Sequence, residues 1–542
     1  MKAAESKLSE ILSSTKVYEI PEYQRAYSWQ PEHVTALVED LYDAFENDMP
    51  EYFMGSIIVI EKAHDAIFEV VDGQQRLTSL NLVFAKIRDL VADPVQRNDV
   101  QKIILPVNNF KKEKSGKPRL VVREKDRLFF ENFVVKGISD FGTKALSETQ
   151  LRMKNNLKTI EDFLVKKSQD ELCGFVDYLL ENVCLVFVKT ENFDSAYRLF
   201  NVLNARGLSL SNGDLLKNKL FQKAQSDDEK ENIKNSWSEL ENLVGLEKLD
   251  VFLSHHRTAI KGDKQQFNLF KEYQNILNEF QGTVSDFCNE LSESASNYHK
   301  ITSKNSFSGN IESLMISLKD VSHDEWIPAL LALMNKNYVT DSAFFSEFLS
   351  LLEKITMQNW VRRLGKTKRN TVYYHAIKNI NGGKSNDEII SSIKEEADNE
   401  EFMKLLASDV YGMGYDAAVL LRIEREMQDD SVFKTFNGVI SVEHILPQKI
   451  KDVVYWEEKF TPEQQKLWVH KLGNLTLLSG RKNSAAQNYS FDKKKEVYLK
   501  RGKKVSFDMT KDVCDETNWT IEILEKRQKE LLEKAAEIWK IE

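Results

Sequence analysis

The stretch "VVDGQQRLTSL" (Val70–Leu80) joins an apolar, β-branched run to the start of a helix with apolar residues at helical spacing. A glycine at such a junction permits positive φ and a tight turn. The first backbone N–H groups of a helix are unpaired and attract anions. We therefore expect a strand, a turn and a helix whose start can hold a phosphate. An acid, a glycine, two amides and an arginine fill the junction: Asp72, Gly73, Gln74, Gln75 and Arg76.

Short strands and helices are expected on both sides of this junction, up to about residue 225. Residues 52–62 and 66–73 predict neighbouring strands, and 184–190 predict a further buried strand. Residues 1–14 predict an amphipathic helix. Residues 191–221 predict a helix, a turn at Arg206 and Gly207, and a second helix that starts near Ser211. This mixture favours an α+β domain.

A second polar cluster lies in "IPEYQRAYSW" (Ile20–Trp29), which contains Gln24 and Arg25. Arg25 and Arg76 could each bind phosphate oxygens through two N–H groups, while glutamines could bind a base or a sugar. Asp72 could hold a metal ion or a ribose hydroxyl. The alternative is a turn capped by Asp72, with both arginines in surface ion pairs.

The composition bounds the class of protein. The 542 residues are 42% hydrophobic and 29% charged, which indicates about two to four globular domains. The formal net charge of −9 does not by itself indicate a nucleic-acid binder. The four cysteines form no CxxC pair, and no apolar run approaches the roughly 20 residues of a membrane span. We expect a cytoplasmic protein divided into 1–225, an all-helical middle at 226–405, and 406–542.

Near the C-terminus, histidine and asparagine residues follow a strand, strand, helix order. The pieces are "EHILP" (Glu443–Pro447), "LGNLTLL" (Leu472–Leu478), Asn483, and "FDKK" (Phe491–Lys494). This order resembles the ββα metal finger of HNH nucleases. A neutral imidazole such as that of His444 can activate water near pH 7, and a hard divalent cation takes carboxylate and amide oxygens. The alternative is a β-hairpin with a buried histidine and surface lysines.

At both ends, these motifs resemble those of GmrSD-type restriction endonucleases. The resemblance implies that His444 is the general base, that Asn474 orients its loop, and that Glu443 and Asn483 bind the metal ion, with Asn488 as a rival to Asn483. It also implies an N-terminal ParB/sulfiredoxin-like domain that binds a nucleoside triphosphate through Gln24, Arg25 and residues 72–76. Asn204, Arg206 and Asp214 would complete this pocket or contact DNA, and Lys494 could face a phosphate.

The fold class expected from this resemblance is multidomain α+β, with a ParB-like domain, a helical middle, and an HNH finger within a largely helical C-terminal domain. The implied function is a nucleotide-regulated, modification-dependent endonuclease of anti-phage defence, with NTPase activity. It would cut double-stranded DNA using Mg²⁺, Mn²⁺ or another divalent ion. The nucleotide (GTP, ATP, CTP or UTP), the DNA target and homo-oligomer formation are left open. Two alternatives are a DNA-binding regulatory NTPase with an inactive finger and a non-enzymatic scaffold.

Overall fold

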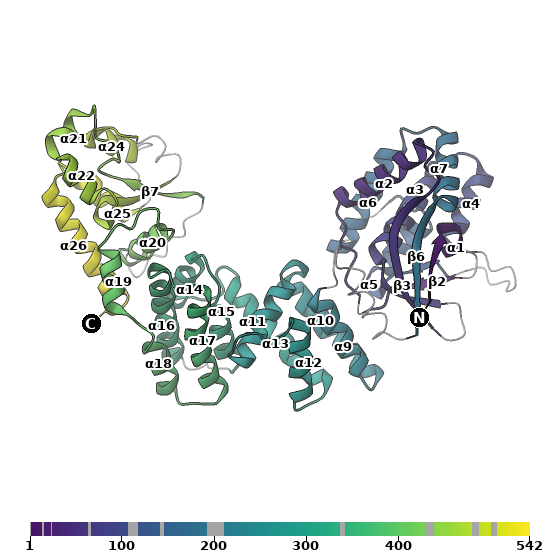
Figure 1. The fold of residues 1–542 in the computed structure, drawn as a ribbon, viewed down its shortest axis with the longest axis horizontal. Helices are drawn as coiled ribbons and strands as arrows, with labels where there is room; N and C mark the ends of the chain where they lie inside the picture. The colour runs from purple at the N-terminus through teal and green to yellow at the C-terminus, as the bar shows by residue number, and fades with distance from the viewer. Residues whose placement is uncertain are drawn as a thin grey trace. The chain divides into compact units, whose positions relative to one another are not determined.

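The computed structural model describes residues 2–12, 16–22, 24–62, 67–106, 117–140, 146–191, 211–336, 342–428, 438–479, 487–499 and 507–541. The chain forms two compact units, residues 1–234 and 235–542 (Figure 1). The second unit contains both the helical middle and the C-terminal section, and the expected three-part division stays a prediction. Within the described ranges, no helix has the length and apolar character needed to cross a membrane.

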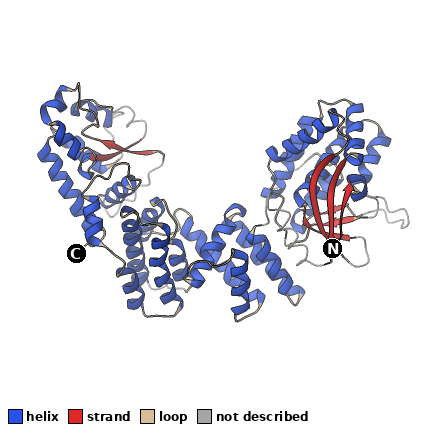
Figure 2. Cartoon of the chain, viewed as in Figure 1, coloured by secondary structure: helices blue, strands red, loops and turns tan. Residues whose placement is uncertain are grey.

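A six-stranded mixed sheet organises the first unit (Figure 2). Its order is β1-β6-β3-β4-β2-β5. The neighbours β3 and β4 run antiparallel and bring Val59 opposite Val70, which confirms the two adjacent strands predicted from the sequence. The strands are β1 (Lys2–Lys7), β2 (Val17–Glu19), β3 (Tyr52–Glu61), β4 (Ile67–Asp72), β5 (Leu120–Val121) and β6 (Val183–Thr190).

The helix predicted for residues 1–14 is wrong. Residues 2–7 form the edge strand β1, which pairs antiparallel with β6 from Lys2 opposite Lys189 to Lys7 opposite Cys184. Among the described residues 2–12, only α1 (Leu8–Ile11) is helical. Strand β6 lies inside the sheet and needs backbone hydrogen-bond partners on both sides. Pairing with β6 therefore outweighs the weak helical pattern of residues 2–7.

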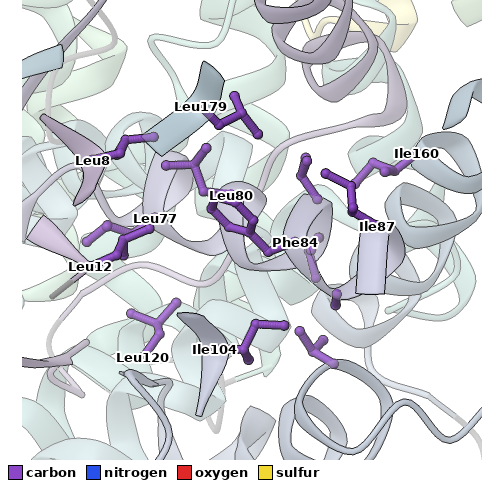
Figure 3. Close-up of a cluster of buried hydrophobic side chains, with 14 of the residues drawn as sticks. Leu8, Leu12, Leu77, Leu80, Phe84, Ile87, Ile104, Leu120, Ile160 and Leu179 are labelled. Carbon is purple, nitrogen blue, oxygen red and sulfur yellow. The ribbon is translucent and has the colours of Figure 1, made fainter. Parts of the chain in front are cut away.

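Helix α3 (Gln74–Leu90) lies at the centre of the core of this unit. Figure 3 shows Leu77, Leu80 and Phe84 of α3 among side chains from other elements, including Leu8 and Leu120. Because α3 is buried over most of its length, its first turn is held in a fixed position at the end of β4. The helices of this unit are α2 (Pro31–Glu46), α4 (Pro94–Ile104), α5 (Glu124–Phe130), α6 (Glu148–Leu164), α7 (Gln169–Glu181) and α9 (Asn212–Lys223), with a π-helical turn η1 (Glu131–Val135).

The described part of 226–405 is helical, as predicted from its sequence. Helix α10 (Asp227–Val244) begins in the first unit and continues into the second. The remaining helices are η2 (Leu246–Lys248), α11 (Leu249–Lys261), α12 (Leu269–Glu279), α13 (Val284–Thr302), α14 (Gly309–Asp320), α15 (Ile327–Asn335), α16 (Ser342–Val361), α17 (Lys366–Asn381), α18 (Asn386–Lys394) and α19 (Asn399–Leu406).

The C-terminal section holds a two-stranded antiparallel sheet surrounded by helices (Figure 2). Strands at 440–444 and 475–479 and a helix at 491–498 agree with the order expected from the sequence. The elements are α20 (Asp416–Glu426), β7 (Ile440–His444), α21 (Val454–Lys459), α22 (Pro462–Trp468), η4 (Leu472–Asn474), β8 (Leu475–Ser479), α24 (Phe491–Tyr498), α25 (Asp508–Asp515) and α26 (Ile521–Ile538).

Candidate functional site

His444 lies at the end of β7, directly opposite Leu475 of β8. It borders a cavity of about 380 Å³ in the C-terminal section. Residues from four separate segments meet at this cavity, so its chemistry depends on the fold as well as on the motif. The lining residues are Tyr411, Val442, Glu443, His444, Pro447, Gln448, Lys449, Gln487, Asn488 and Lys494.

Both ring nitrogens of His444 have side-chain partners. Its Nε2 lies 3.2 Å from Nδ1 of His470, and its Nδ1 lies 3.3 Å from Nε2 of Gln448. The Tyr411 ring covers the imidazole with its centroid 4.0 Å away. Burial, followed by the electrostatic influence of His470 and Lys494, lowers the pKa of His444 to about 3. The ring is therefore neutral near pH 7, which is the form that can accept a proton.

Asn474 is fully buried and holds the chain that follows β7. Its side-chain oxygen accepts a hydrogen bond from Leu446 N at 2.7 Å, and its amide group donates to the carbonyls of Leu446 and Val469 at 2.9 Å. Its backbone carbonyl accepts from Ile445 N at 2.9 Å. These contacts are what a residue that orients the loop after His444 requires. Asn474 does not line the cavity.

Glu443 and Lys494 form a buried ion pair beside His444. Lys494 Nζ lies 2.8 Å from Glu443 Oε1 and also donates to the His444 carbonyl at 2.5 Å. Tyr498 donates to the same carboxylate oxygen at 3.0 Å. Burial raises the pKa of Glu443 and lowers the pKa of Lys494, while each opposes the shift of the other through its charge. Lys494 is 1% exposed, and its Nζ is bound to protein groups. The DNA contact expected for this lysine stays a prediction.

The lining of the cavity carries oxygen ligands of the kind that bind a hydrated divalent cation. Glu443 supplies a carboxylate, and Gln487 and Asn488 supply amide groups on the same lining. Asn488, the rival to Asn483 in the sequence, therefore lies where a ligand is needed. Asn483 itself lies outside the described residues. These residues fit a hard metal ion that keeps several of its waters.

In the first unit, the quoted junction forms the turn expected from its sequence. Gly73 has φ of 94°, and a Cβ atom there would lie 2.7 Å from Ile57 Cγ1, so only glycine suits the position. Helix α3 starts at the next residue. Gly73 is its N-cap and contributes no side-chain capping hydrogen bond. The first N–H groups of a helix are the groups that can bind an anion.

The glutamines of the two N-terminal clusters hold the clusters together. Gln24 donates to the carbonyls of Val70 and Val71 at 3.3 and 2.9 Å. Gln75 accepts from the backbone N–H groups of Ser28 and Trp29 at 2.9 and 3.2 Å, and it donates to Ala26 O. The structure therefore brings the two clusters side by side, as the sequence suggested. It gives Gln24 and Gln75 scaffold contacts instead of leaving them open to a ligand.

Gln74 differs from these two glutamines. Its amide group donates to the Arg25 carbonyl at 2.8 Å, whereas its side-chain oxygen is buried and has no hydrogen-bond partner among the described residues. A buried polar oxygen without a partner is costly, because folding removes its water without replacing the hydrogen bond. Gln74 is thus the amide of this junction that could accept a hydrogen bond from a ligand.

The charged residues of the N-terminal clusters have different surroundings. Arg76 Nη1 donates to Ser56 O at 2.8 Å, which gives this arginine a structural partner on β3. Asp214 caps α9 together with Ser211. Burial raises the pKa of Asp214, and the positive charge of Arg25 opposes this shift. Asn204 and Arg206 lie outside the described residues.

The sequence motifs did not indicate His470, Tyr411 or Gln448 as members of the site. Gln448 directly follows the "EHILP" motif, a proximity that could have suggested it. His470 and Tyr411 carry no local signal, because they approach His444 only through the fold.

Comparisons with known proteins match both ends of the chain. Residues 8–221 match the family model described as GmrSD restriction endonuclease, N-terminal domain. Residues 396–534 match the model described as GmrSD restriction endonucleases, C-terminal domain. A search of curated proteins gave no match. The first matched range contains the α3 junction of the first compact unit, and the second contains the His444 cavity of the second compact unit.

Proposed function

The chain belongs to the GmrSD family of restriction endonucleases, and from this premise we propose that it cuts DNA at the His444 cavity under the control of a nucleotide bound at the start of α3. The observation that carries the proposal is the neutral, hydrogen-bonded imidazole of His444 on a cavity that also holds a carboxylate. A general base and a cation-binding group are the two things that phosphodiester hydrolysis requires.

The cutting step follows from the His444 position. Nδ1 of His444 takes a proton from a water molecule while the water oxygen bonds to phosphorus. The bond from phosphorus to the leaving sugar oxygen breaks, and that oxygen takes a proton from solvent. Gln448, which occupies Nδ1 here, has an exposed side chain, so an incoming water can replace its amide group.

Glu443 and Asn488 would hold the divalent cation, with Asn488 in place of Asn483, which the sequence indicated as the ligand and which lies outside the described residues. When bound, Mg²⁺ or Mn²⁺ would neutralise negative charge on the phosphate and on the leaving oxygen. Asn474 keeps the His444 loop in place during this step through its contacts with Leu446 and Val469. The finger is accordingly assigned to the HNH class.

The nucleotide site is proposed at the first turn of α3, within a ParB-like domain. Its support is the uncapped helix start at Gly73, which suits a phosphate group, and the partnerless oxygen of Gln74, which suits an N–H or O–H of the nucleotide. Arg25, whose charge acts on the Asp214 carboxyl, would bind phosphate, and Asp214 would bind a sugar hydroxyl. Family membership supports a role in defence against phage, directed at modified DNA.

One observation favours a second candidate, a DNA-binding regulatory NTPase whose finger does not cut. Lys494 already neutralises one oxygen of Glu443, and this weakens the attraction of that carboxylate for a cation. Cleavage assays with and without EDTA separate the two functions, because only the nuclease loses an activity on DNA when the metal is removed.

The nuclease assignment is tested with His444→Ala and with a matched variant of an exposed histidine, His375→Ala. DNA from phages with unmodified, glucosylated and phosphorothioate-marked genomes is incubated with each protein and Mg²⁺ or Mn²⁺. We expect cleavage by wild type and His375→Ala and none by His444→Ala. Equal cleavage by all three proteins would remove His444 from the site.

The nucleotide assignment is tested with Arg25→Ala and Arg76→Ala. We expect Arg25→Ala to weaken the binding of nucleoside triphosphates, measured by titration calorimetry, and to lower the melting temperature as well, because Arg25 offsets the burial of the Asp214 carboxyl. Arg76→Ala should lower both the nucleotide affinity and the melting temperature, because Arg76 also binds the Ser56 carbonyl. Unchanged nucleotide affinity in both variants would argue against a pocket at this junction.

A further inference from the structure

His470 approaches the His444 ring from a different part of the chain. It lies after α22, and its carbonyl accepts hydrogen bonds from Val410 N at 2.9 Å and Tyr411 N at 3.2 Å. The ring of Tyr411 stacks on that of His470, with centroids 5.6 Å apart and planes 10° apart. Lys471 reinforces the same junction by donating to Ala407 O at 3.0 Å. His470 is thus fixed in position by both its backbone and its ring.

The hydrogen bonds around His444 determine which nitrogen carries its proton. The amide Nε2 of Gln448 can only donate, so Nδ1 of His444 must be the acceptor in that contact. In a neutral imidazole the proton then sits on Nε2. That N–H donates to Nδ1 of His470 at 3.2 Å, and His470 carries its own proton on Nε2. The chain of donors therefore runs from Gln448 through His444 to His470.

We propose that His470 is a positioning residue for DNA cleavage: by accepting the Nε2–H of His444, it holds the tautomer and ring orientation in which Nδ1 faces the cavity as the base. This inference rests on the proposed role of His444. Asn474 plays a different part, because its side chain holds the loop through Leu446 and Val469.

The physical consequence appears when His444 takes a proton from water. The ring then has N–H groups on both nitrogens, and Nδ1 of His470 continues to accept the one on Nε2. Without this acceptor, the proton of neutral His444 can reside on Nδ1, and a ring in that tautomer cannot take a proton from a water in the cavity. The wrong tautomer costs rate without weakening DNA binding, since His470 does not line the cavity.

The test compares two variants of His470 with a control. His470→Leu removes the acceptor and keeps an apolar side chain beside Tyr411. His470→Asn restores an acceptor oxygen close to the position of Nδ1. The control is His375→Leu, at an exposed histidine. Cleavage is measured on the DNA that the wild type cuts, with Mg²⁺, as kcat and KM separately, and folding is checked by thermal unfolding.

We expect His470→Leu to lower kcat by roughly 10- to 100-fold, the range found for residues that orient a functional group, with KM changed less than about twofold. His470→Asn should recover most of the loss. Wild-type kcat in His470→Leu would overturn the inference, as would equal losses in the Leu and Asn variants. If wild type and His444→Ala cut equally, the proposed function fails instead, and the role of His470 fails with it.

Discussion

Lys494 Nζ lies 2.8 Å from the Glu443 carboxylate, with the two side chains 1% and 8% exposed. The pair joins α24 to the end of β7, and Lys494 also binds the carbonyl of His444. The strand that carries His444 is therefore tied to the following helix by a charge pair that water cannot screen.

Breaking this pair should destabilise the protein strongly. Lys494→Met leaves the Glu443 carboxylate buried without its cation, which costs about 3–5 kcal/mol of unfolding free energy. Urea unfolding measures the loss. The adjacent variant Lys493→Met removes a surface ion pair with Glu496, side chains 56% and 69% exposed, and should change stability by less than about 1 kcal/mol. Equal effects of the two substitutions would contradict the buried pair.

A methyl group at Gly473 should force the turn before β8 away from α26. A Cβ atom there would lie 2.9 Å from the backbone of Gln528, which cannot move without shifting the helix. We expect Gly473→Ala to lower stability by about 1–3 kcal/mol, as overpacking does, and to slow cleavage, because Asn474 is the next residue. Gly365→Ala has open space around its Cβ atom and serves as control in thermal unfolding. Similar melting temperatures of the Gly473→Ala and Gly365→Ala variants would show that α26 can shift at little cost in stability.

Gln75 should contribute to folding even when no nucleotide is present. Gln75→Ala removes the acceptor for the N–H groups of Ser28 and Trp29 and should cost about 2 kcal/mol. The melting temperature without nucleotide reports this loss. Gln96→Ala, at an exposed glutamine of the same unit, should leave it nearly unchanged. A normal melting temperature together with weak nucleotide binding would instead make Gln75 a direct ligand.

Acid should weaken the second unit through His256. Burial lowers the pKa of His256 from 6.5 to about 4, so the unfolded chain binds the proton more readily than the folded one. Stability is therefore complete above about pH 6.5 and falls as the pH drops towards 4, by about 3 kcal/mol for this group. His256→Gln should show a shallower fall between pH 7 and pH 4 in urea unfolding, whereas His375→Gln should follow the wild type. Parallel curves for all three proteins would exclude His256 as the source.

Local patterns were sufficient for most elements near the site. The β-branched runs before Asp72 and before His444 predicted strands, and the glycine at 73 predicted the tight turn that the structure contains. The helix predicted for residues 1–14 was wrong because a distant strand, not a local pattern, determines the structure there. An edge strand is selected by its partner β6, and nothing in the hexapeptide itself favours that pairing over a helix.

The sequence by itself determined the family and the strand-to-helix junction at Val70–Leu80, and it indicated His444 as the candidate base, because these depend on residue type and short-range spacing. Only the tertiary structure decided what each polar group contacts. Folding brings Gln75 within hydrogen-bond distance of the backbone of Ser28 and Trp29. It also pairs Lys494 with Glu443 and His470 with His444. A hydrogen bond forms between groups that folding brings within about 3 Å, and sequence separation carries no information about that distance.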